Sequence, residues 1–250
     1  MPIASAPIAI CLVPILFYNR AMQWRFGFCG TQEIARWRGA LAPLLADIGA
    51  LPRRRPMGQL VKSLISGRTR DAVSLAAYHR LGRRFGSPAR LAAAPVAAVE
   101  REIARVTFAE AQAAWLVAAL RRIAAERGDY ALDFLGDLPL DDALAWLERL
   151  PGVGRKVAAS TLNASTLDRP VFIVDSHVLR VLRRLGFVAP NAEARAASEA
   201  VTAAMPAWRG EDFLRLHIAL KRLGQRACRP ERPDCGACPL VHDCRNPRAR

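Results

Sequence analysis

The sequence predicts an all-α protein that ends in a loop with neither helical nor strand character. Between Thr31 and Gly224, Ala, Leu and Arg recur at the spacing of 3.6 residues that a helix requires, and no stretch alternates as a strand would. Hydrophobic residues make up 52% of the 250 residues, enough for one large or two modest hydrophobic cores. The exception is the segment 228–244, which glycine and prolines interrupt.

The helical pattern divides into ten segments, which end near glycines or prolines. We expect helices at 31–48, 57–66, 70–85, 95–105, 108–127, 140–149, 155–165, 175–185, 191–204 and 211–224. Thr107 and Glu110 have the spacing of a capping box and predict the start of the fifth helix. The run 53–56, Arg-Arg-Arg-Pro, is typical of a linker, a turn that faces phosphate or a solvated basic loop.

The charge balance favours a polyanionic partner. Lys and Arg number 37 against 22 Asp and Glu, which gives a formal net charge of +15 and points first to nucleic acid. The arginines are spread from Arg20 to Arg250 rather than gathered on one amphipathic helix, so an acidic membrane surface is disfavoured.

Residues 1–19 carry no charge and include the apolar run 8–17. This run is short, contains Pro14 and follows no positive segment, so it suits neither a signal peptide nor a membrane span. We expect residues 1–21 to be a disordered extension, with Met22 as an alternative start. The protein is then expected in a bacterial-type cytoplasm, with the nucleoid and not at a membrane, where thiols stay reduced.

Four cysteines stand in the C-terminal loop at the spacing C-x6-C-x2-C-x5-C. Prolines there remove backbone donors, so something other than backbone hydrogen bonding must order the loop. One C-x2-C pair flanked by two single cysteines suits a four-thiolate iron-sulfur cluster, because structural zinc more often uses two close pairs. Zinc and disulfides remain the alternatives; Cys11 and Cys29 are expected to be buried or free thiols. The four cysteines are Cys228, Cys235, Cys238 and Cys244.

A glycine-bearing turn separates the expected helices 140–149 and 155–165. It reads Leu150-Pro151-Gly152-Val153-Gly154-Arg155-Lys156, and its glycines allow a tight reversal. The free amides at the start of the next helix would hold one DNA phosphate, as in a helix-hairpin-helix, without reading sequence. An ordinary connection between two helices is the alternative.

Lys156 is one of only three lysines in the chain. Arginine would serve a phosphate clamp equally well, but only lysine can lose its proton and attack carbon once its surroundings lower its pKa. Lys156 is therefore a candidate nucleophile, and a plain surface cation is the competing interpretation.

An apolar segment, 171–174, leads to Asp175 at the start of the helix 175–185. The extended return is long enough to bring this carboxylate beside Lys156, where it could stabilise positive charge on a sugar ring as an N-glycosidic bond breaks. Asp175 is also suited to cap the helix, and the two roles are compatible. We expect His177 to make structural hydrogen bonds rather than to act as an acid or base.

With these motifs the chain resembles the endonuclease III family of helix-hairpin-helix DNA glycosylases. LPGVGRK at 150–156, VDSH at 174–177 and the cysteine loop at 228–244 occur in the family's order, and the resemblance covers about 56–245. It implies two all-α domains that flank a DNA-binding cleft, with the target base flipped out of the duplex.

The resemblance also implies roles for single residues. Lys156 would attack the sugar C1′ and form a Schiff base, and Asp175 would be the catalytic aspartate. The four loop cysteines would hold a [4Fe-4S] cluster. One domain would span 56–168; the other would join 22–55 to 169–250. The predicted DNA contacts are Arg68, Phe108, Leu150, Gly152, Val153, Gly154 and Arg155.

Two departures concern the substrate. Arg68 stands where relatives carry a glutamine that fills the space of the flipped base, and the segment 106–108 matches the family's wedge only loosely. Specificity for oxidised pyrimidines is therefore not implied. The adenine glycosylase branch fits less well, because its catalytic glutamate near Leu64 and its extra C-terminal domain are absent.

Three hypotheses follow. The first is a monomeric bifunctional glycosylase that removes a damaged base from double-stranded DNA and cleaves the abasic site by β-elimination. The second is a monofunctional glycosylase in which Asp175 activates water and Lys156 only positions DNA. The third is a DNA-binding protein without catalysis.

Overall fold

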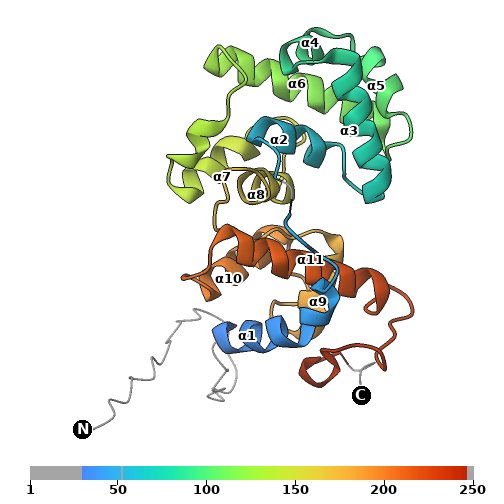
Figure 1. Cartoon of the computed structure of the whole chain (residues 1–250), viewed down its shortest axis with the longest axis vertical. Helices are drawn as coiled ribbons and strands as arrows, with labels where there is room; N and C mark the ends of the chain where they lie inside the picture. Colours follow the sequence, from blue (N-terminus) through green and yellow to red (C-terminus); the bar gives the residue numbers. More distant parts are fainter. Residues whose placement is uncertain (1–29, 52, 247–250) are drawn as a thin grey trace, which may run out of the picture.

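The computed structural model describes residues 30–51 and 53–246, and most of this part of the chain is helical (Figure 1). Within these residues no strand forms, and the single β-bridge joins Arg54 to Ser165. The all-α fold class is thus confirmed. The α-helices are α1 (Gly30–Leu41), α2 (Pro56–Leu64), α3 (Asp71–Phe85), α4 (Pro88–Ala93), α5 (Val96–Ile103), α6 (Ala109–Arg127), α7 (Leu140–Glu148), α8 (Arg155–Asn163), α9 (Ser176–Leu185), α10 (Ala194–Ala204) and α11 (Gly210–Arg226). Short 3₁₀ helices are η1 (Ala42–Leu45), η2 (Asp133–Gly136) and η3 (Val241–Asp243).

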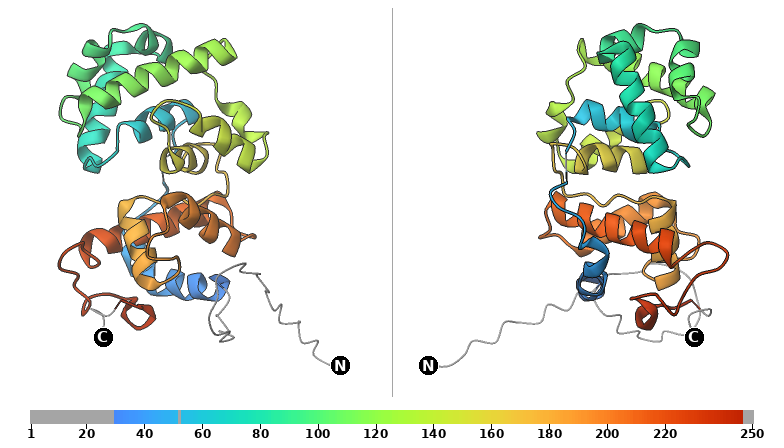
Figure 2. Two further views of the ribbon diagram at one scale, coloured as in Figure 1. Left: turned by 180° about the vertical axis from the view of Figure 1, so that it is seen from behind. Right: turned by 45° about the vertical axis from the view of Figure 1, so that its right-hand side comes forward.

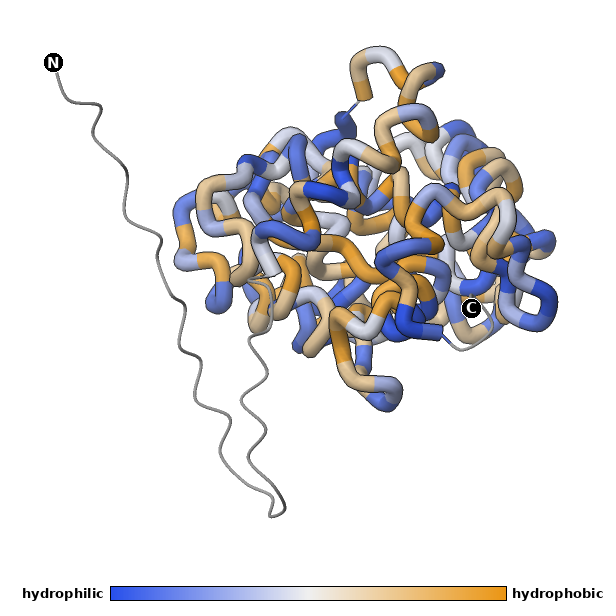
Figure 3. The backbone as a smooth tube through the Cα atoms, turned by 90° about the horizontal axis from the view of Figure 1, so that it is seen from below, coloured by the Kyte–Doolittle hydropathy of each residue, from blue (hydrophilic) through white to orange (hydrophobic). Residues whose placement is uncertain are grey.

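The helices gather into two lobes, one above the other in Figure 1. The upper lobe holds α2 to α8 around one hydrophobic core; the lower lobe holds α1, α9, α10, α11 and the cysteine loop around a second core. Seen from below in Figure 3, hydrophobic stretches run through the middle of the molecule and hydrophilic ones gather at outer turns. The predicted boundaries at 55/56 and 168/169 stay predictions, as does the nature of residues 1–21, which with Cys11 and Cys29 lie outside the described residues.

Two chain segments cross between the lobes, as the back view of Figure 2 shows. Thr166 donates its amide to the Arg54 carbonyl, and the Arg53 guanidinium binds the carbonyls of Asn163 and Ser165 as well as the carboxylate of Glu211 at 2.9 Å. The interpretation of this basic run as a phosphate-facing or solvated turn is therefore wrong for Arg53, because its guanidinium is bound by groups of the protein itself.

The extended segment before α9 lies along the seam between the lobes. Side chains alternate along an extended chain, and here Val171 and Ile173 enter the upper core while Phe172 and Val174 enter the lower one. All four are at most 2% exposed. Because both faces of the segment are buried, the sequence is continuously apolar, and Asp175 emerges at the seam.

The expected helices all overlap observed ones, with differences at their ends. The helix expected at 31–48 ends at Leu41 and continues as η1, where Pro43 provides no amide donor. The short helix α4 was not expected; Ser87 caps it by accepting a hydrogen bond from the Arg90 amide. None of the helices in the described ranges is long and apolar enough to cross a membrane.

The predicted capping box at Thr107 is wrong. The residue before α6 is Phe108, with a left-handed backbone (φ 58°) and no capping side chain. Thr107 instead donates its hydroxyl to the carbonyl of Arg68 and its amide to the hydroxyl of Thr69. The hydroxyl thus joins two loops and does not start the helix.

Candidate functional site

A hollow of about 840 Å³ opens at the seam and receives side chains from both lobes. Helices α2 and α8 of the upper lobe form one wall, and the start of α9 with one face of α11 forms the other. Lys156 and Asp175 both line this hollow. The structure therefore brings the two predicted catalytic residues to one site.

Lys156 is partly buried in the second position of α8. Its ammonium donates to the Ser66 hydroxyl at 2.6 Å and lies 3.5 Å from the carbonyl of Ser63. Burial is the main cause that lowers its pKa to about 8, and the charges of Lys62 and Lys221 lower it further. An appreciable fraction of this side chain is then unprotonated amine near neutral pH, as a nucleophile requires.

Asp175 is the N-cap of α9. Its Oδ1 accepts hydrogen bonds from the amides of His177 and Val178, each at 2.9 Å. Burial alone would raise the pKa of Asp175, but His217, the Val178 amide and Lys221 outweigh it, and the pKa lies below its ordinary value. The carboxylate is therefore ionised at neutral pH while it caps the helix.

The two histidines near Asp175 differ. The His177 ring lies 3.3 Å from an Arg180 nitrogen, and its Cβ packs against Gly224 of α11. These contacts are structural, in line with the prediction for His177. His217 was missed: its Nδ1 lies 2.8 Å from the Ile173 carbonyl and so donates to it, and burial lowers the pKa of the ring to about 4. His217 is thus a neutral group in the wall of the hollow.

Sequence reasoning also missed a buried polar cluster beneath Lys156. Gln59 donates to the hydroxyls of Ser63 and Ser160, which lie 2.9 Å from each other. The available signal was the spacing of Gln59 and Ser63, which places two polar side chains one turn apart in a helix whose other residues, apart from Lys62, are apolar or glycine.

The hairpin at 150–156 has the expected tight reversal, and Gly152 occupies a left-handed conformation (φ 73°). A Cβ at this position would stand 2.7 Å from the Cβ of Trp115, so glycine is required there by both conformation and space. The side chains of Leu150 and Val153 are 3% and 5% exposed, and their amides donate to Leu147 and Leu150. Neither residue can offer its side chain or its amide to DNA.

Arg155 is the third hairpin residue whose side chain is engaged within the protein, in this case by ion pairs. Its side chain is 8% exposed, and its guanidinium pairs with Glu148 at 2.7 Å and with Glu199 at 3.2 Å. The predicted DNA contact of Arg155 therefore reduces to its backbone amide at the start of α8. With Gly152 and Gly154, the hairpin offers only main-chain groups.

Arg68 and Phe108 lie side by side on neighbouring loops. Each has a left-handed backbone, with φ of 51° and 58°, and the Arg68 guanidinium lies 5.9 Å from the centroid of the Phe108 ring. Phe108 is 60% exposed, the largest value among the large hydrophobic side chains that the structure describes. The two residues form a protruding pair, which we call the wedge.

The four loop cysteines surround a second, smaller hollow in the lower lobe. Arg184 donates to Cys228 Sγ at 3.3 Å and binds the carbonyls of Arg229 and Pro230, and burial raises the pKa of the Cys238 thiol. Within residues 30–51 and 53–246, no three metal-binding side chains converge on a single-ion site. The donor set nevertheless fits a thiolate-bound group, because four thiols share one hollow beside a cation.

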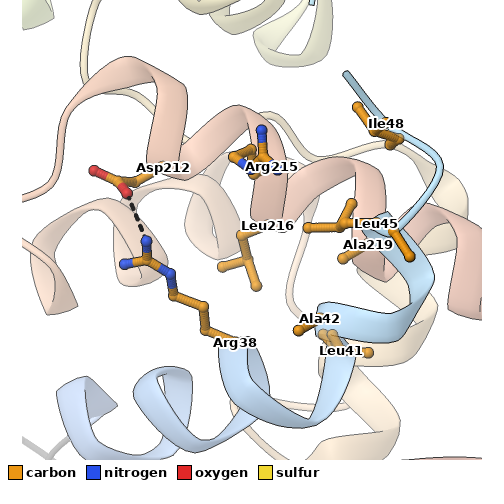
Figure 4. Close-up of a pocket in the computed structure, with 10 residues that line it drawn as sticks. Arg38, Leu41, Ala42, Leu45, Ile48, Asp212, Arg215, Leu216 and Ala219 are labelled. Atoms are coloured by element: carbon orange, nitrogen blue, oxygen red, sulfur yellow. Dashed lines mark ion pairs between the residues drawn. The ribbon is translucent and has the colours of Figure 1, made fainter. Parts of the chain in front are cut away.

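A third hollow, drawn in Figure 4, lies between α1, η1 and α11. Its walls are mainly apolar, with an ion pair between Arg38 and Asp212 at its rim. It shares no residue with the hollow of Lys156 and contains no group suited to the chemistry considered above.

Comparison with known proteins assigns the family. Residues 61–206 match the model of the HhH-GPD superfamily of base excision DNA repair proteins. The chain belongs to this superfamily. The matched range contains the hairpin, Lys156 and Asp175, and the resemblance to endonuclease III is confirmed.

Two curated relatives align with most of this chain but with different shares of their own length. It is 32% identical over 199 residues to the chloroplastic endonuclease III homolog 1 of Arabidopsis thaliana, covering 77% of this chain and 50% of that protein. It is 30% identical over 196 residues to endonuclease III of Thermotoga maritima, covering 78% of this chain and 85% of that one. The chain spans about half the length of its Arabidopsis relatives.

Solved structures agree with this HhH-GPD assignment. A trapped covalent endonuclease III–DNA intermediate aligns with a TM-score of 0.70 at 25% identity, over 86% of this chain and 95% of that one. A thermostable thymine-DNA glycosylase aligns with a TM-score of 0.69 at 17% identity, which shows a shared fold alone.

Proposed function

We propose that the protein is a bifunctional DNA glycosylase and abasic-site lyase that acts on a flipped damaged base in double-stranded DNA. The observation that carries the proposal is that Lys156, with a pKa of about 8, and the ionised Asp175 line one hollow. The relatives named endonuclease III and the trapped covalent intermediate of an endonuclease III with DNA support the same chemistry.

In the proposed reaction, the Lys156 amine attacks C1′ of the deoxyribose. The N-glycosidic bond breaks, and the base leaves with the bonding electrons and takes up a proton. Asp175 stabilises the positive charge that develops on the sugar. Loss of the amine proton and opening of the ring give a Schiff base, and removal of a C2′ proton then expels the 3′ phosphate by β-elimination.

Borohydride trapping on a duplex with one abasic site tests the nucleophile. Wild type should become covalently attached to the DNA, and Lys156→Gln should lose trapping by at least about a thousandfold, because the Lys156 amine forms the Schiff base in the proposed reaction. Asp175→Asn should excise a base slowly and keep measurable trapping on a ready-made abasic site.

The monofunctional alternative gives a different pattern. If Lys156→Gln keeps base excision while trapping is absent from wild type, Asp175 activates water and Lys156 only positions DNA. A protein that binds duplex DNA but releases no base from any member of a lesion panel contradicts catalysis altogether. The same panel identifies the lesion, which the presence of Arg68 leaves open, and sedimentation of the complex tests the expected monomer.

We further propose that Cys228, Cys235, Cys238 and Cys244 hold a [4Fe-4S] cluster. Bound there, the cluster would supply structure, because it would tie the proline-rich loop to α9 through Arg184 and so shape a basic surface for DNA. Protein purified without air should contain iron and sulfide in equal amounts. One zinc per chain would contradict the proposal, and Cys235→Ser should lower the iron content.

We also propose that the protein is located in a bacterial cytoplasm, with the nucleoid. Its relatives include bacterial and chloroplastic proteins, so a bacterial cytoplasm stays a prediction. A fluorescent fusion that follows the nucleoid would support it.

A further inference from the structure

All three lysines of the chain line the same hollow. Lys62 comes from α2, Lys156 from α8 and Lys221 from α11, while every other basic residue among the 37 is arginine. The three helices belong to both lobes, so only the folded chain brings these amines together.

Lys62 and Lys221 share one carboxylate. Asp71, the first residue of α3, binds Lys221 through Oδ2 at 2.6 Å and approaches Lys62 through Oδ1 at 4.0 Å. Its place at a helix N-terminus favours the ionised carboxylate. Two ammonium groups facing a single carboxylate leave one net positive charge in this part of the hollow.

Neither lysine is well placed as an ordinary phosphate contact. Their side chains are 17% and 23% exposed, whereas Arg68 of the wedge is an exposed residue. Their charges are therefore directed mainly into the hollow, where they act on groups already there.

The groups that face Lys156 come from every element around it. They are Lys62 on α2, Asp71 on α3, Asp175 at the start of α9, and His217 with Lys221 on α11; Arg68, Arg70 and His177 also line the hollow. His217 is neutral near pH 7, so the charges that act on Lys156 are the two cations Lys62 and Lys221 and the two carboxylates Asp175 and Asp71. Asp175 is held by two backbone amides and Asp71 by Lys221, so both carboxylates are already partnered.

We propose that Lys62 and Lys221 are positioning residues that act through Lys156: their charges increase the fraction of its amine that is unprotonated and able to attack, and Asp71 limits how strongly they do so. The inference rests on the proposed function of Lys156. A cationic neighbour is an established way of activating a lysine nucleophile. The directions agree, because Lys62 and Lys221 lower the pKa of Lys156 whereas Asp175 and Asp71 raise it.

The scarcity of lysine permits a direct test without DNA. Reductive methylation with ¹³C-formaldehyde labels the three lysine amines and the terminal amine, and Lys156→Arg identifies the Lys156 signal. In Lys62→Met and Lys221→Met, the midpoint of the Lys156 titration should rise by roughly one pH unit, because a nearby positive charge is removed. In Asp71→Asn the midpoint should fall, since a negative charge is lost.

Borohydride trapping supplies the second readout. The acid limb of its pH profile should move to higher pH in Lys62→Met and Lys221→Met, so that trapping at pH 6.5 falls by about tenfold while trapping at pH 9 is retained. Lys62→Arg and Lys221→Arg keep the charge and should keep the profile. Arg101→Met on α5, which does not line the hollow, controls for the loss of net charge.

The opposite directions separate an electrostatic role from general damage to the site, which would lower trapping at every pH in all three variants. Lys156 titrations that stay unchanged, or that move the same way in Lys62→Met and Asp71→Asn, overturn the inference. A wild type with the expected titration but no trapping contradicts the proposed function instead.

Discussion

The hairpin and the wedge are two surfaces expected to contact DNA, and they are built in opposite ways. The hairpin makes its left-handed turn with Gly152, buries the side chains around it and presents main-chain groups. The wedge makes two left-handed turns with Arg68 and Phe108, neither of them glycine, and exposes their side chains.

The difference shows what each surface can recognise. Main-chain amides suit a phosphate, which is the same at every nucleotide, so the hairpin needs shape and no exposed side chain. A left-handed backbone at a bulky residue is strained. The contacts of Thr107 with Arg68 and Thr69 hold the two strained loops together, and an exposed ring of this kind is suited to enter the base stack.

Gly152→Ala should have the largest effect on stability. A Cβ there meets both the left-handed backbone and Trp115 at 2.7 Å, so we expect a loss of about 3 kcal/mol in the free energy of unfolding and weaker binding to undamaged duplex DNA. Chemical denaturation and fluorescence anisotropy measure the two quantities.

Gly128→Ala is the matched control. Gly128 has nearly the same backbone (φ 77°), but a Cβ there meets nothing within 4 Å. It should lose only about 1 kcal/mol from conformational strain. Equal losses in both variants would mean that the packing of Trp115 on the hairpin contributes nothing.

Lys156→Met tests the free-energy cost of burying the charged amine that follows the hairpin; the exposed wedge has no buried charge of this kind. Burial lowers the folded-state pKa of Lys156 to about 8, below the value near 10.5 of the unfolded chain. The unfolded state then binds more protons between these values, so the stability of wild type rises as the pH rises from about 8 to about 10.5.

At pH 7 most of the lysine is charged and most of its burial cost is present, so Lys156→Met should be more stable than wild type by roughly 1 kcal/mol, a value discounted for partial exposure. The advantage should shrink as the pH approaches 10. Urea titrations at pH 7 and pH 10 measure the free energy of unfolding of both proteins. If the difference between them is the same at both pH values, the amine is not buried.

Phe108→Gly should have the smallest effect on stability, with the sign opposite to that of Gly152→Ala. Glycine relieves the left-handed strain at φ 58°, and the lost ring is mostly in water, so the free energy of unfolding should rise by about 0.5 kcal/mol or stay unchanged. Excision of a damaged base should nevertheless slow by about tenfold. A variant as active as wild type would contradict the predicted contact of Phe108 with DNA.

Local features of the sequence predicted local structure well. Gly152, the N-cap Asp175 and the helix-ending Gly86 and Gly186 occupy the conformations that their residue types favour. The placing of Lys156 and Asp175 at one site was also within reach, because the extended return after α8 is long enough to bring Asp175 back beside Lys156.

The predictions that failed concern residues whose partners lie far along the chain. The local sequence suggests that Arg155 and Arg53 contact phosphate, but in the fold they pair with Glu199 and Glu211 of the other lobe. His217 and Lys221 lie on a helix whose pattern is plainly amphipathic, and only the packing of α11 against α8 turns that face toward Lys156. No local pattern contains this information.

The division of the lobes along the chain has a consequence during synthesis. Apart from contributions such as Leu214, all residues of the upper core have been made once the ribosome has passed residue 173, whereas α1, the first of the described helices, packs against α10 and α11, made near the end. The upper lobe can therefore fold while translation continues, and α1 must wait for α11. In newly made chains the exposed apolar face of α1, with Ile34 and Trp37, is the surface that a chaperone would meet.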